Sequence, residues 1–155
     1  MIKVCFLCHG NICRSTMAEF VFKDFVKRKG TADKFSICSK ALHNDEIGSP
    51  VHYGTARILD RLKIDYSKKR AEKLVPSDGG YYDFIIGMEE SNVRAIKRII
   101  GDNLSARVLK LLDFTPTPSD IADPWYTRDF ELTHKQIDSG TDCFIEFLKQ
   151  NGYLY

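Results

Sequence analysis

The sequence predicts an α/β protein with a parallel sheet covered by helices on both faces. Short apolar runs alternate with longer segments of helical periodicity along the whole chain. The first run, Val4–Leu7, is continuously apolar, as expected of a strand buried on both faces. The 155 residues are 43% apolar and 28% charged, an ordinary globular balance. We therefore expect one domain over residues 1–155, with ligands bound at the carboxyl ends of the strands.

The elements follow in order from that first strand. A helix from Ser15, which could act as its N-cap, has a wide apolar face and a stop signal at Gly30. Gly140 lies inside the last helical pattern, where glycine costs about 1 kcal/mol. The remaining expected elements are a strand over 35–39, a loop over 42–50, a helix over 52–62, a strand over 83–88, a helix over 89–100, a strand over 106–112, a loop over 113–124 and a C-terminal helix over 130–148.

Charge and composition exclude several functional classes. Lys and Arg total 23 and Asp and Glu 21, so the basic excess typical of nucleic-acid binders is missing. The clusters Lys27–Lys29 and Lys68–Arg70 are interpreted as solvated helix ends rather than a polyanion patch. No apolar run approaches the roughly 20 residues of a membrane span. The five cysteines are expected to be reduced thiols of a cytoplasmic protein, because no secretory signal precedes them.

The candidate chemistry lies in the turn Cys8–Ser15, between the first strand and the first helix. Amide groups of a loop curled over a helix N-terminus form an anion-binding nest, and Gly10 is expected to allow the curl. A helix N-terminus and a guanidinium favour ionisation of a thiol at Cys8. The planar fork of Arg14 matches two oxygens of a phosphate. This combination predicts a thiolate nucleophile beneath a bound phosphoryl group.

Other uses of the same thiols are conceivable. Cys5 and Cys8 have redox CxxC spacing, but Cys5 should point sideways from a buried strand. A metal site from Cys5, Cys8, His9 and Cys13 has no second ligand pair downstream, so no metal is expected. Three further histidines are interpreted as ordinary surface residues: His43, His52 and His134.

The turn Cys8–Ser15 resembles the signature loop of the low-molecular-weight protein tyrosine phosphatases. The resemblance covers almost the whole chain and includes the segments Met88–Asn92 and Asp123–Tyr126. It implies a flavodoxin-like, doubly wound sheet of four parallel strands. It also implies a cofactor-independent hydrolase acting on phosphotyrosine proteins or small aryl phosphates.

The resemblance implies a role for each matching residue. Cys8 would become a phosphocysteine, Arg14 would bind the phosphoryl oxygens, and Asp123 would act as general acid and then general base. Asn11 would shape the loop, and Ser15 would stabilise the thiolate. The other expected substrate-binding residues are His9, Gly10, Ile12, Cys13, Trp125 and Tyr126.

Three of these assignments have plainer alternatives. A phenol has a pKa near 10 and leaves poorly unless it is protonated, which suits an acid at Asp123, but an Asp-Pro pair is also common in turns. Trp125 and Tyr126 could form an aromatic wall or could pack the loop onto the body. Cys13 could form a reversible disulfide with Cys8, as the matching residue does in the family, or could be a small buried residue.

The sequence also departs from the family pattern. Thr16 replaces a usual proline, which should affect stability only slightly. Asp45, with His43 beside it, falls where an aromatic wall residue is usual, and this predicts weaker binding of acidic peptides. Ser67 aligns with a histidine that supports the loop asparagine, whereas Ser39 matches the other supporting residue.

Two rival functions remain open from the sequence. An arsenate reductase of related fold needs a further, closely spaced cysteine pair, and only Cys38 and Cys143 lie beyond the loop. A non-catalytic phosphoprotein-binding module would not need both Cys8 and Asp123. The expected partner is the phosphorylated substrate, with no nucleic acid or membrane, and the expected state is a monomer or weak homodimer.

Overall fold

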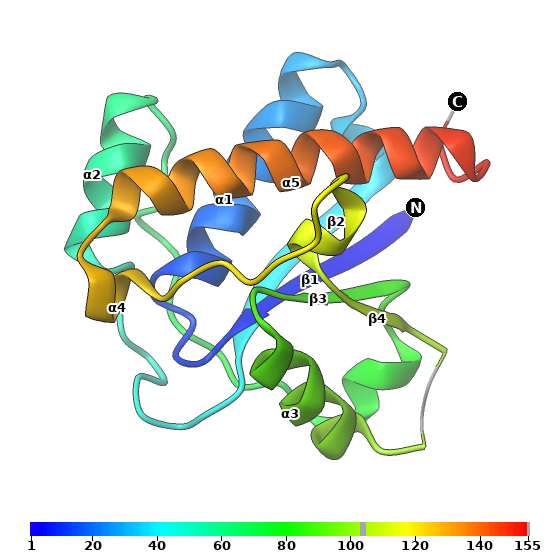
Figure 1. The fold of residues 1–155 in the computed structure, drawn as a ribbon, viewed down its shortest axis with the longest axis horizontal. Coiled ribbons are helices and arrows are strands. Elements are labelled where there is room, and N and C mark those ends of the chain that lie inside the picture. The colour runs from blue at the N-terminus through cyan, green and yellow to red at the C-terminus, as the bar shows by residue number, and fades with distance from the viewer. Residues whose placement is uncertain (103–104, 155) are drawn as a thin grey trace.

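The structure, a computed structural model, describes residues 1–102 and 105–154 (Figure 1). In this part of the chain four strands form a parallel sheet, as predicted, and the structure gives their order as β2-β1-β3-β4. Its strands are β1 (Ile2–Cys8), β2 (Phe35–Ala41), β3 (Phe84–Gly87) and β4 (Arg107–Lys110). Its helices are α1 (Arg14–Arg28), α2 (Tyr53–Arg61), α3 (Glu90–Ile100), α4 (Pro124–Thr127) and α5 (Phe130–Gln150). Short 3-10 turns cover Ala32–Lys34, Pro76–Gly80 and Leu111–Phe114.

Helices cover both faces of the sheet, which explains the continuous apolar run in β1. Val4 and Phe6 point into the core shared with α1, α2 and α5, whereas Cys5 and Leu7 point into the core shared with α3. All four side chains are fully buried. The central strand therefore ends, at Cys8, in the crevice where doubly wound sheets bind ligands.

The end of β4 differs from its expected bounds. The strand stops at Lys110, and Leu111 and Leu112 turn into a 3-10 helix that packs on α5. A Cβ atom at Gly140 would lie only 2.5 Å from Leu111 Cγ. Gly140 therefore allows α5 to approach this turn closely, which accounts for a glycine inside a long helix.

The second basic cluster was wrongly interpreted as a helix end. Residues 68–70 lie in an irregular segment after α2, and only 10% of the Lys69 side chain is exposed. The first cluster, Lys27–Lys29, is exposed at the end of α1 as predicted. No helix among the described residues is long and apolar enough to cross a membrane.

Candidate active site

The floor of the site joins the end of β1 to the first turn of α1. Cys8 Sγ and Ser15 Oγ share a hydrogen bond of 3.0 Å, and the Ser15 amide lies 3.4 Å from the same sulfur. Ser15 is not the N-cap that the sequence suggested. Cys13 occupies that position without a side-chain cap, because the Ser15 hydroxyl is directed at Cys8 and Asn11. The positive end of α1 thus faces the sulfur.

Asn11, rather than Gly10, makes the sharp curl of the loop. Asn11 has φ of 60° and is 1% exposed, whereas Gly10 is not among the left-handed residues. Asparagine tolerates this conformation better than most residues do. Its Nδ2 donates to Ser15 Oγ and Ser39 Oγ, both at 2.8 Å, and its Oδ1 accepts from the Glu72 amide at 3.1 Å. The expected support from Asn11 and Ser39 is thus visible in the loop geometry.

A buried carboxylate continues this network away from the pocket. Ser39 Oγ donates to Glu19 Oε1 at 2.5 Å, and Glu19 is 3% exposed. Lys69 and Lys23 approach its two oxygens at 3.2 and 2.6 Å. Ser67, aligned with the family's supporting histidine, instead forms hydrogen bonds within its own exposed turn. The positive charge behind the loop therefore comes from Lys69 and Lys23, which both contact Glu19.

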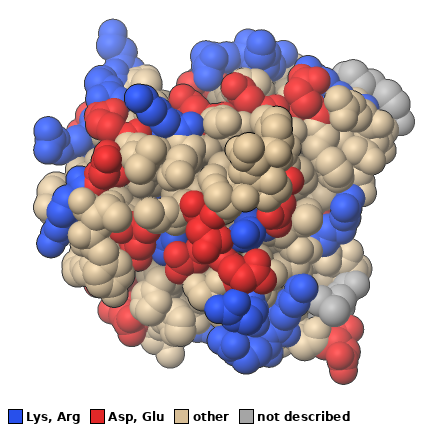
Figure 2. Space-filling view, in the orientation of Figure 1, with Lys and Arg blue, Asp and Glu red and all other residues tan. Residues whose placement is uncertain are grey.

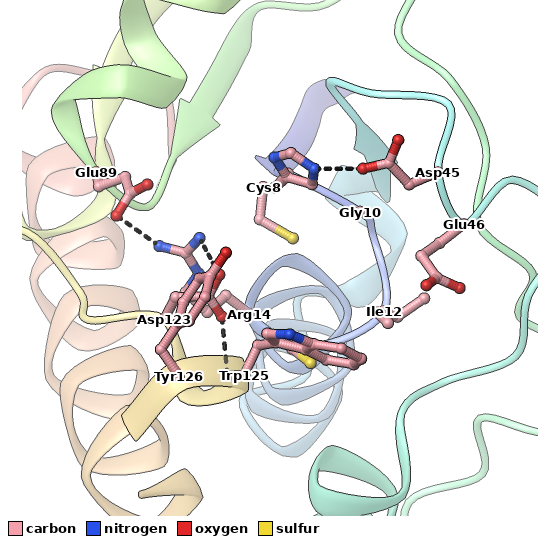
Figure 3. Close-up of a pocket in the computed structure, with 12 residues that line it drawn as sticks. Cys8, Gly10, Ile12, Arg14, Asp45, Glu46, Glu89, Asp123, Trp125 and Tyr126 are labelled. Atoms are coloured by element: carbon pink, nitrogen blue, oxygen red, sulfur yellow. Dashed lines mark hydrogen bonds and ion pairs between the residues drawn. The ribbon is translucent and has the colours of Figure 1, made fainter. Parts of the chain in front are cut away.

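The guanidinium of Arg14 is buried and held by three oxygens. Its Nη1 donates to the Ile121 carbonyl at 2.9 Å. Nη1 also lies 3.1 Å from Glu89 Oε2, and Nη2 lies 3.3 Å from Asp123 Oδ2 (Figure 3). Only 1% of Arg14 is exposed. A fixed, planar guanidinium beside Cys8 is suited to binding two phosphoryl oxygens.

Asp123 caps a short helix with one carboxylate oxygen and faces Arg14 with the other. Its Oδ1 accepts a hydrogen bond from the Trp125 amide at 3.0 Å and caps α4, which the sequence did not predict. Its Oδ2 faces Arg14, and the side chain is 24% exposed. The segment before it is anchored by the Ile121 amide, which donates to the Met88 carbonyl at 2.9 Å. The carboxylate therefore lies at the pocket with access to solvent.

Two walls rise above this floor and enclose a cavity of about 350 Å³. On one side, His9 Nε2 lies 2.7 Å from Asp45 Oδ2, and the His9 ring stacks on His43 at 4.1 Å between centroids. Trp125 and Tyr126 line the cavity as well, and in Figure 3 Trp125 and Asp45 lie on opposite sides of the Cys8 sulfur. The His9 imidazole on this side of the cavity is therefore held by both Asp45 and His43.

The rim of the cavity is acidic. Its lining includes Asp45, Glu46, Glu89 and Asp123. The hydrogen bond with His9 holds the pKa of Asp45 below its ordinary value, so this carboxylate stays charged at neutral pH. Figure 2 shows acidic side chains gathered in the middle of one face, above a band of Lys and Arg. Groups that flank a bound phosphate would meet negative charge.

The two other cysteines near Cys8 in the sequence, Cys5 and Cys13, are both buried. Cys13 is buried, burial raises the pKa of its thiol, and its carbonyl accepts from the Thr16 and Thr55 hydroxyls. Cys5 belongs to the core on the opposite face of the sheet from Cys8. The CxxC spacing therefore does not bring two thiols together. Within residues 1–102 and 105–154, no three His, Cys, Asp or Glu side chains are grouped to hold a metal ion.

The sequence interpretation missed two groups that orient Arg14. Glu89 lies two residues after the end of β3, and Cys8 ends β1, so its place near a neighbouring strand end was a usable signal. Asn92 fixes that turn, because its Oδ1 accepts from the Met88 and Glu89 amides at 2.9 and 3.2 Å. The Ile121 carbonyl gave no signal, since any residue could supply it.

Known proteins with similar sequences identify the family. A profile of the low molecular weight phosphotyrosine protein phosphatases matches residues 3–153. The chain belongs to this family. It is 37% identical over 155 residues to the low molecular weight protein-tyrosine-phosphatase PtpA of Staphylococcus epidermidis, covering 99% of this chain and 98% of that protein. It is 33% identical over 156 residues to YfkJ of Bacillus subtilis, which has the same description, covering 99% and 100% of the two chains.

Solved structures of phosphatases confirm the fold. The crystal structure of YfkJ superposes with a TM-score of 0.92 at 32% identity, covering 97% of this chain and 96% of that one. The low molecular weight protein tyrosine phosphatase of Streptococcus pyogenes superposes with a TM-score of 0.83 at 36% identity, covering 97% and 93%. The family resemblance, the doubly wound parallel sheet and membership of a hydrolase family are therefore confirmed.

Proposed function

We propose that this protein hydrolyses phosphotyrosine and small aryl phosphate monoesters through a phosphocysteine on Cys8. One observation carries the proposal: the Cys8 sulfur, the buried Arg14 guanidinium and the Asp123 carboxylate line one cavity. Arg14 Nη2 lies 3.3 Å from Asp123 Oδ2, so the phosphate-binding group and the proton donor are adjacent. A thiolate, a cation and an acid are the groups that phosphoryl transfer to sulfur requires.

In the first step the Cys8 thiolate attacks phosphorus, and the bond from phosphorus to the phenolic oxygen breaks. The Ser15 hydroxyl and amide stabilise the sulfur anion before attack, at 3.0 and 3.4 Å. Arg14 and the loop amides stabilise the charge on the transferring phosphoryl oxygens. Asp123, in its protonated form, donates a proton to the departing oxygen.

In the second step water attacks the phosphorus of the phosphocysteine. Asp123, now a carboxylate, takes a proton from that water, and the bond from sulfur to phosphorus breaks. Inorganic phosphate leaves and the Cys8 thiolate is restored. The same carboxyl group serves both steps because the phenol and the water occupy the same side of the phosphorus.

We infer the substrate class from the walls of the cavity. A flat phenyl ring fits between the fixed His9 imidazole and Trp125, and the deep position of Cys8 favours a long phenolic ester over a short serine ester. The acidic rim disfavours peptides with Asp or Glu beside the phosphotyrosine. The expected substrates are therefore phosphotyrosine proteins without strongly acidic flanks.

The rival functions receive less support. Arsenate reduction would need a cysteine relay, but Cys38 lies on β2 in the core opposite Cys8, and Cys143 lies on α5. A non-catalytic binding module would have no use for the acid next to Arg14. We further propose that residues 1–155 form one phosphatase domain of a cytoplasmic protein. It would act without cofactor, nucleic acid or membrane, as a monomer or weak homodimer.

The test is an aryl phosphate assay with excess chelator present. The wild type should release phosphate, and Cys8→Ser should abolish release while circular dichroism stays unchanged. Asp123→Asn should slow phenyl phosphate by about 10²–10⁴-fold but should slow an activated nitrophenyl ester much less. Equal losses on the two esters would remove Asp123 from the acid role, and an active Cys8→Ser variant would exclude the phosphocysteine.

A further inference from the structure

Two cysteines lie side by side on the face of the sheet opposite Cys8. Cys5 in β1 and Cys38 in β2 are paired residues of adjacent parallel strands. Both side chains belong to the core on the α3 side, whereas Cys8 belongs to the core on the α1 side. The proposed phosphatase reaction makes no use of either thiol.

The surroundings of Cys38 activate its sulfur. The Tyr82 hydroxyl lies 3.1 Å from Cys38 Sγ, and the Lys40 ammonium lies on the same face of β2, two residues further along. A hydrogen bond with the Cys5 thiol, followed by that with Tyr82, lowers the pKa of Cys38 to about 7 although burial opposes the shift. Burial raises the pKa of Cys5, which therefore stays a protonated thiol. One member of the pair is poised as a nucleophile and the other as its resolving partner.

Small reagents can reach Cys38 but not Cys5. β2 is the outer strand of the described sheet, and Cys38 is only partly buried. Cys5 is fully buried beneath it. A small oxidant would therefore react at Cys38 first.

We propose that Cys5 and Cys38 form a second, peroxide-oxidisable thiol pair, separate from the nucleophile, whose disulfide slows the phosphatase. The Cys38 thiolate attacks one oxygen of hydrogen peroxide, which gives a sulfenic acid and, with a proton, water. The Cys5 thiol then attacks that sulfur; the new sulfur–sulfur bond forms, the sulfur–oxygen bond breaks, and the Cys5 proton leaves with hydroxide as a second water. Peroxide gains two electrons and each sulfur loses one.

The geometry of neighbouring strands makes such a bridge possible but strained. Strands lie about 4.8 Å apart, within the Cα range of roughly 4.4–6.8 Å that a disulfide spans. Side chains of paired residues in a parallel ladder project side by side, so their Cβ atoms must be drawn together to reach about 3.8 Å. Strained disulfides are more easily reduced than structural ones. The bridge should therefore be reversible and should pull β2 toward β1.

That movement would act on the nucleophile loop through Ser39, the next residue of β2. Ser39 Oγ accepts from Asn11 at 2.8 Å and donates to Glu19, while its carbonyl accepts from Lys69 at 2.7 Å. A shift of Ser39 weakens the support of Asn11, which holds the loop in its left-handed curl. This link to activity rests on the proposed function, whereas formation of the bridge does not.

The direct test maps the bridge in the full-length wild type. Orthophosphate is added to occupy the Cys8 loop, the protein is treated with hydrogen peroxide, and free thiols are capped with iodoacetamide. Cleavage by trypsin and chymotrypsin after Lys3, Phe6, Phe35 and Lys40 separates Cys5 from Cys8. We expect peptide 4–6 linked to peptide 36–40, and release of both by dithiothreitol. Recovery of Cys38 as a capped thiol, or as an overoxidised acid without the link, would overturn the proposal.

Cys143 serves as the reference thiol for reactivity, and Cys38→Ser serves as the control variant for activity. Without peroxide and at pH 7.5, Cys38 should be alkylated about tenfold faster than Cys143, the other half-buried cysteine, and equal rates would contradict the proposed activation.

After peroxide and phosphate are removed, wild-type activity should be at least halved and should return with dithiothreitol, while Cys38→Ser should keep its activity. Linked protein with full activity would refute the coupling. Linked protein from a preparation that was inactive from the start would instead refute the proposed function.

Discussion

The nucleophile loop and the segment that carries the acid meet at one pocket but are held very differently. In the loop over residues 8–15, Asn11, Arg14 and Ser15 are each at most 1% exposed and each forms hydrogen bonds to neighbouring elements. Over residues 120–126, only Ile121 and Pro124 are buried, and Tyr126 is 81% exposed. The loop is part of the protein core, whereas the acid segment lies on the surface and is anchored mainly through Ile121.

This difference separates two tasks of the same reaction. Every phosphate monoester presents the same phosphoryl group, so the groups that bind it can be fixed in the core at high precision. The leaving group differs between substrates, and in the proposed reaction it would contact exposed side chains of the acid segment and of the opposite wall. Changes in the loop should therefore affect all substrates and stability together, while changes at the surface should discriminate between substrates.

The largest effect is expected at Arg14. Arg14→Lys keeps the charge but loses the planar fork, and it leaves the carboxylates of Glu89 and Asp123 without a shared partner. The value of kcat/KM should fall about 10³-fold for every aryl phosphate, whatever its leaving group. Steady-state kinetics on a series of substituted phenyl phosphates measures this. A loss below tenfold, or one that varies with the leaving group, would contradict a purely phosphoryl-binding role.

Asn11 tests whether the loop is part of the core. Asn11→Ala removes three hydrogen bonds, two of them buried, and keeps a Cβ atom at φ of 60°, so the unfolding free energy should fall by about 3 kcal/mol. Asn11→Gly loses the same bonds without the backbone strain and should be about 1 kcal/mol less destabilised. Urea denaturation of both variants measures the difference. Equal stabilities would mean that the left-handed conformation costs nothing here.

Substitutions in the two walls of the cavity test whether exposed side chains contact the leaving group. His9→Ala or Trp125→Ala should raise KM for phenyl phosphate about fivefold, because a ring contact is lost, with kcat nearly unchanged. Acetyl phosphate has no ring and serves as the matched control substrate, and its KM should stay the same. An equal rise in KM for both substrates would assign these residues to phosphate binding instead of to the leaving group.

The smallest effect is expected at Asp45. Its carboxylate is exposed and its hydrogen bond with His9 lowers its pKa, so it carries charge throughout the neutral range. Asp45→Asn should improve KM about twofold for a phosphotyrosyl peptide with acidic flanks and should worsen it for one with basic flanks. High salt should erase both changes, because exposed charges are screened. The same shift for both peptides would rule out an electrostatic cause.

The fold was predictable because its signals are local. Continuous apolar strands, amphipathic helices and glycine stops gave the element order, and alternation of strand and helix gave the parallel sheet. The residues at which strands and helices end were harder to predict from the sequence. Packing on α5 turns Leu111 and Leu112 out of β4, and only the tertiary contact with Gly140 explains why.

Candidate site residues could be named from the sequence where a residue type has a characteristic chemical role. Cys8, Arg14 and Asp123 were predicted to be a nucleophile, an anion-binding cation and an acid, and the structure places all three in one pocket. The groups that hold the Arg14 guanidinium in place were missed. A carboxylate such as that of Glu89 or a carbonyl such as that of Ile121 can serve many purposes, so its presence in the sequence predicts none of them. Gly10 was expected to allow the curl of the loop, but Asn11 is the residue with the left-handed conformation, since backbone angles are not visible in composition.

The most direct test of the central claim is to trap the enzyme during turnover. Wild type mixed with nitrophenyl phosphate and quenched within milliseconds, then digested and sequenced by mass spectrometry, should carry one phosphoryl group on the sulfur of Cys8. The Asp123→Asn variant, whose second step is slowed, should carry more of it. A phosphoryl group found on His9 instead, or none at any time point while phosphate is being released, would contradict the account.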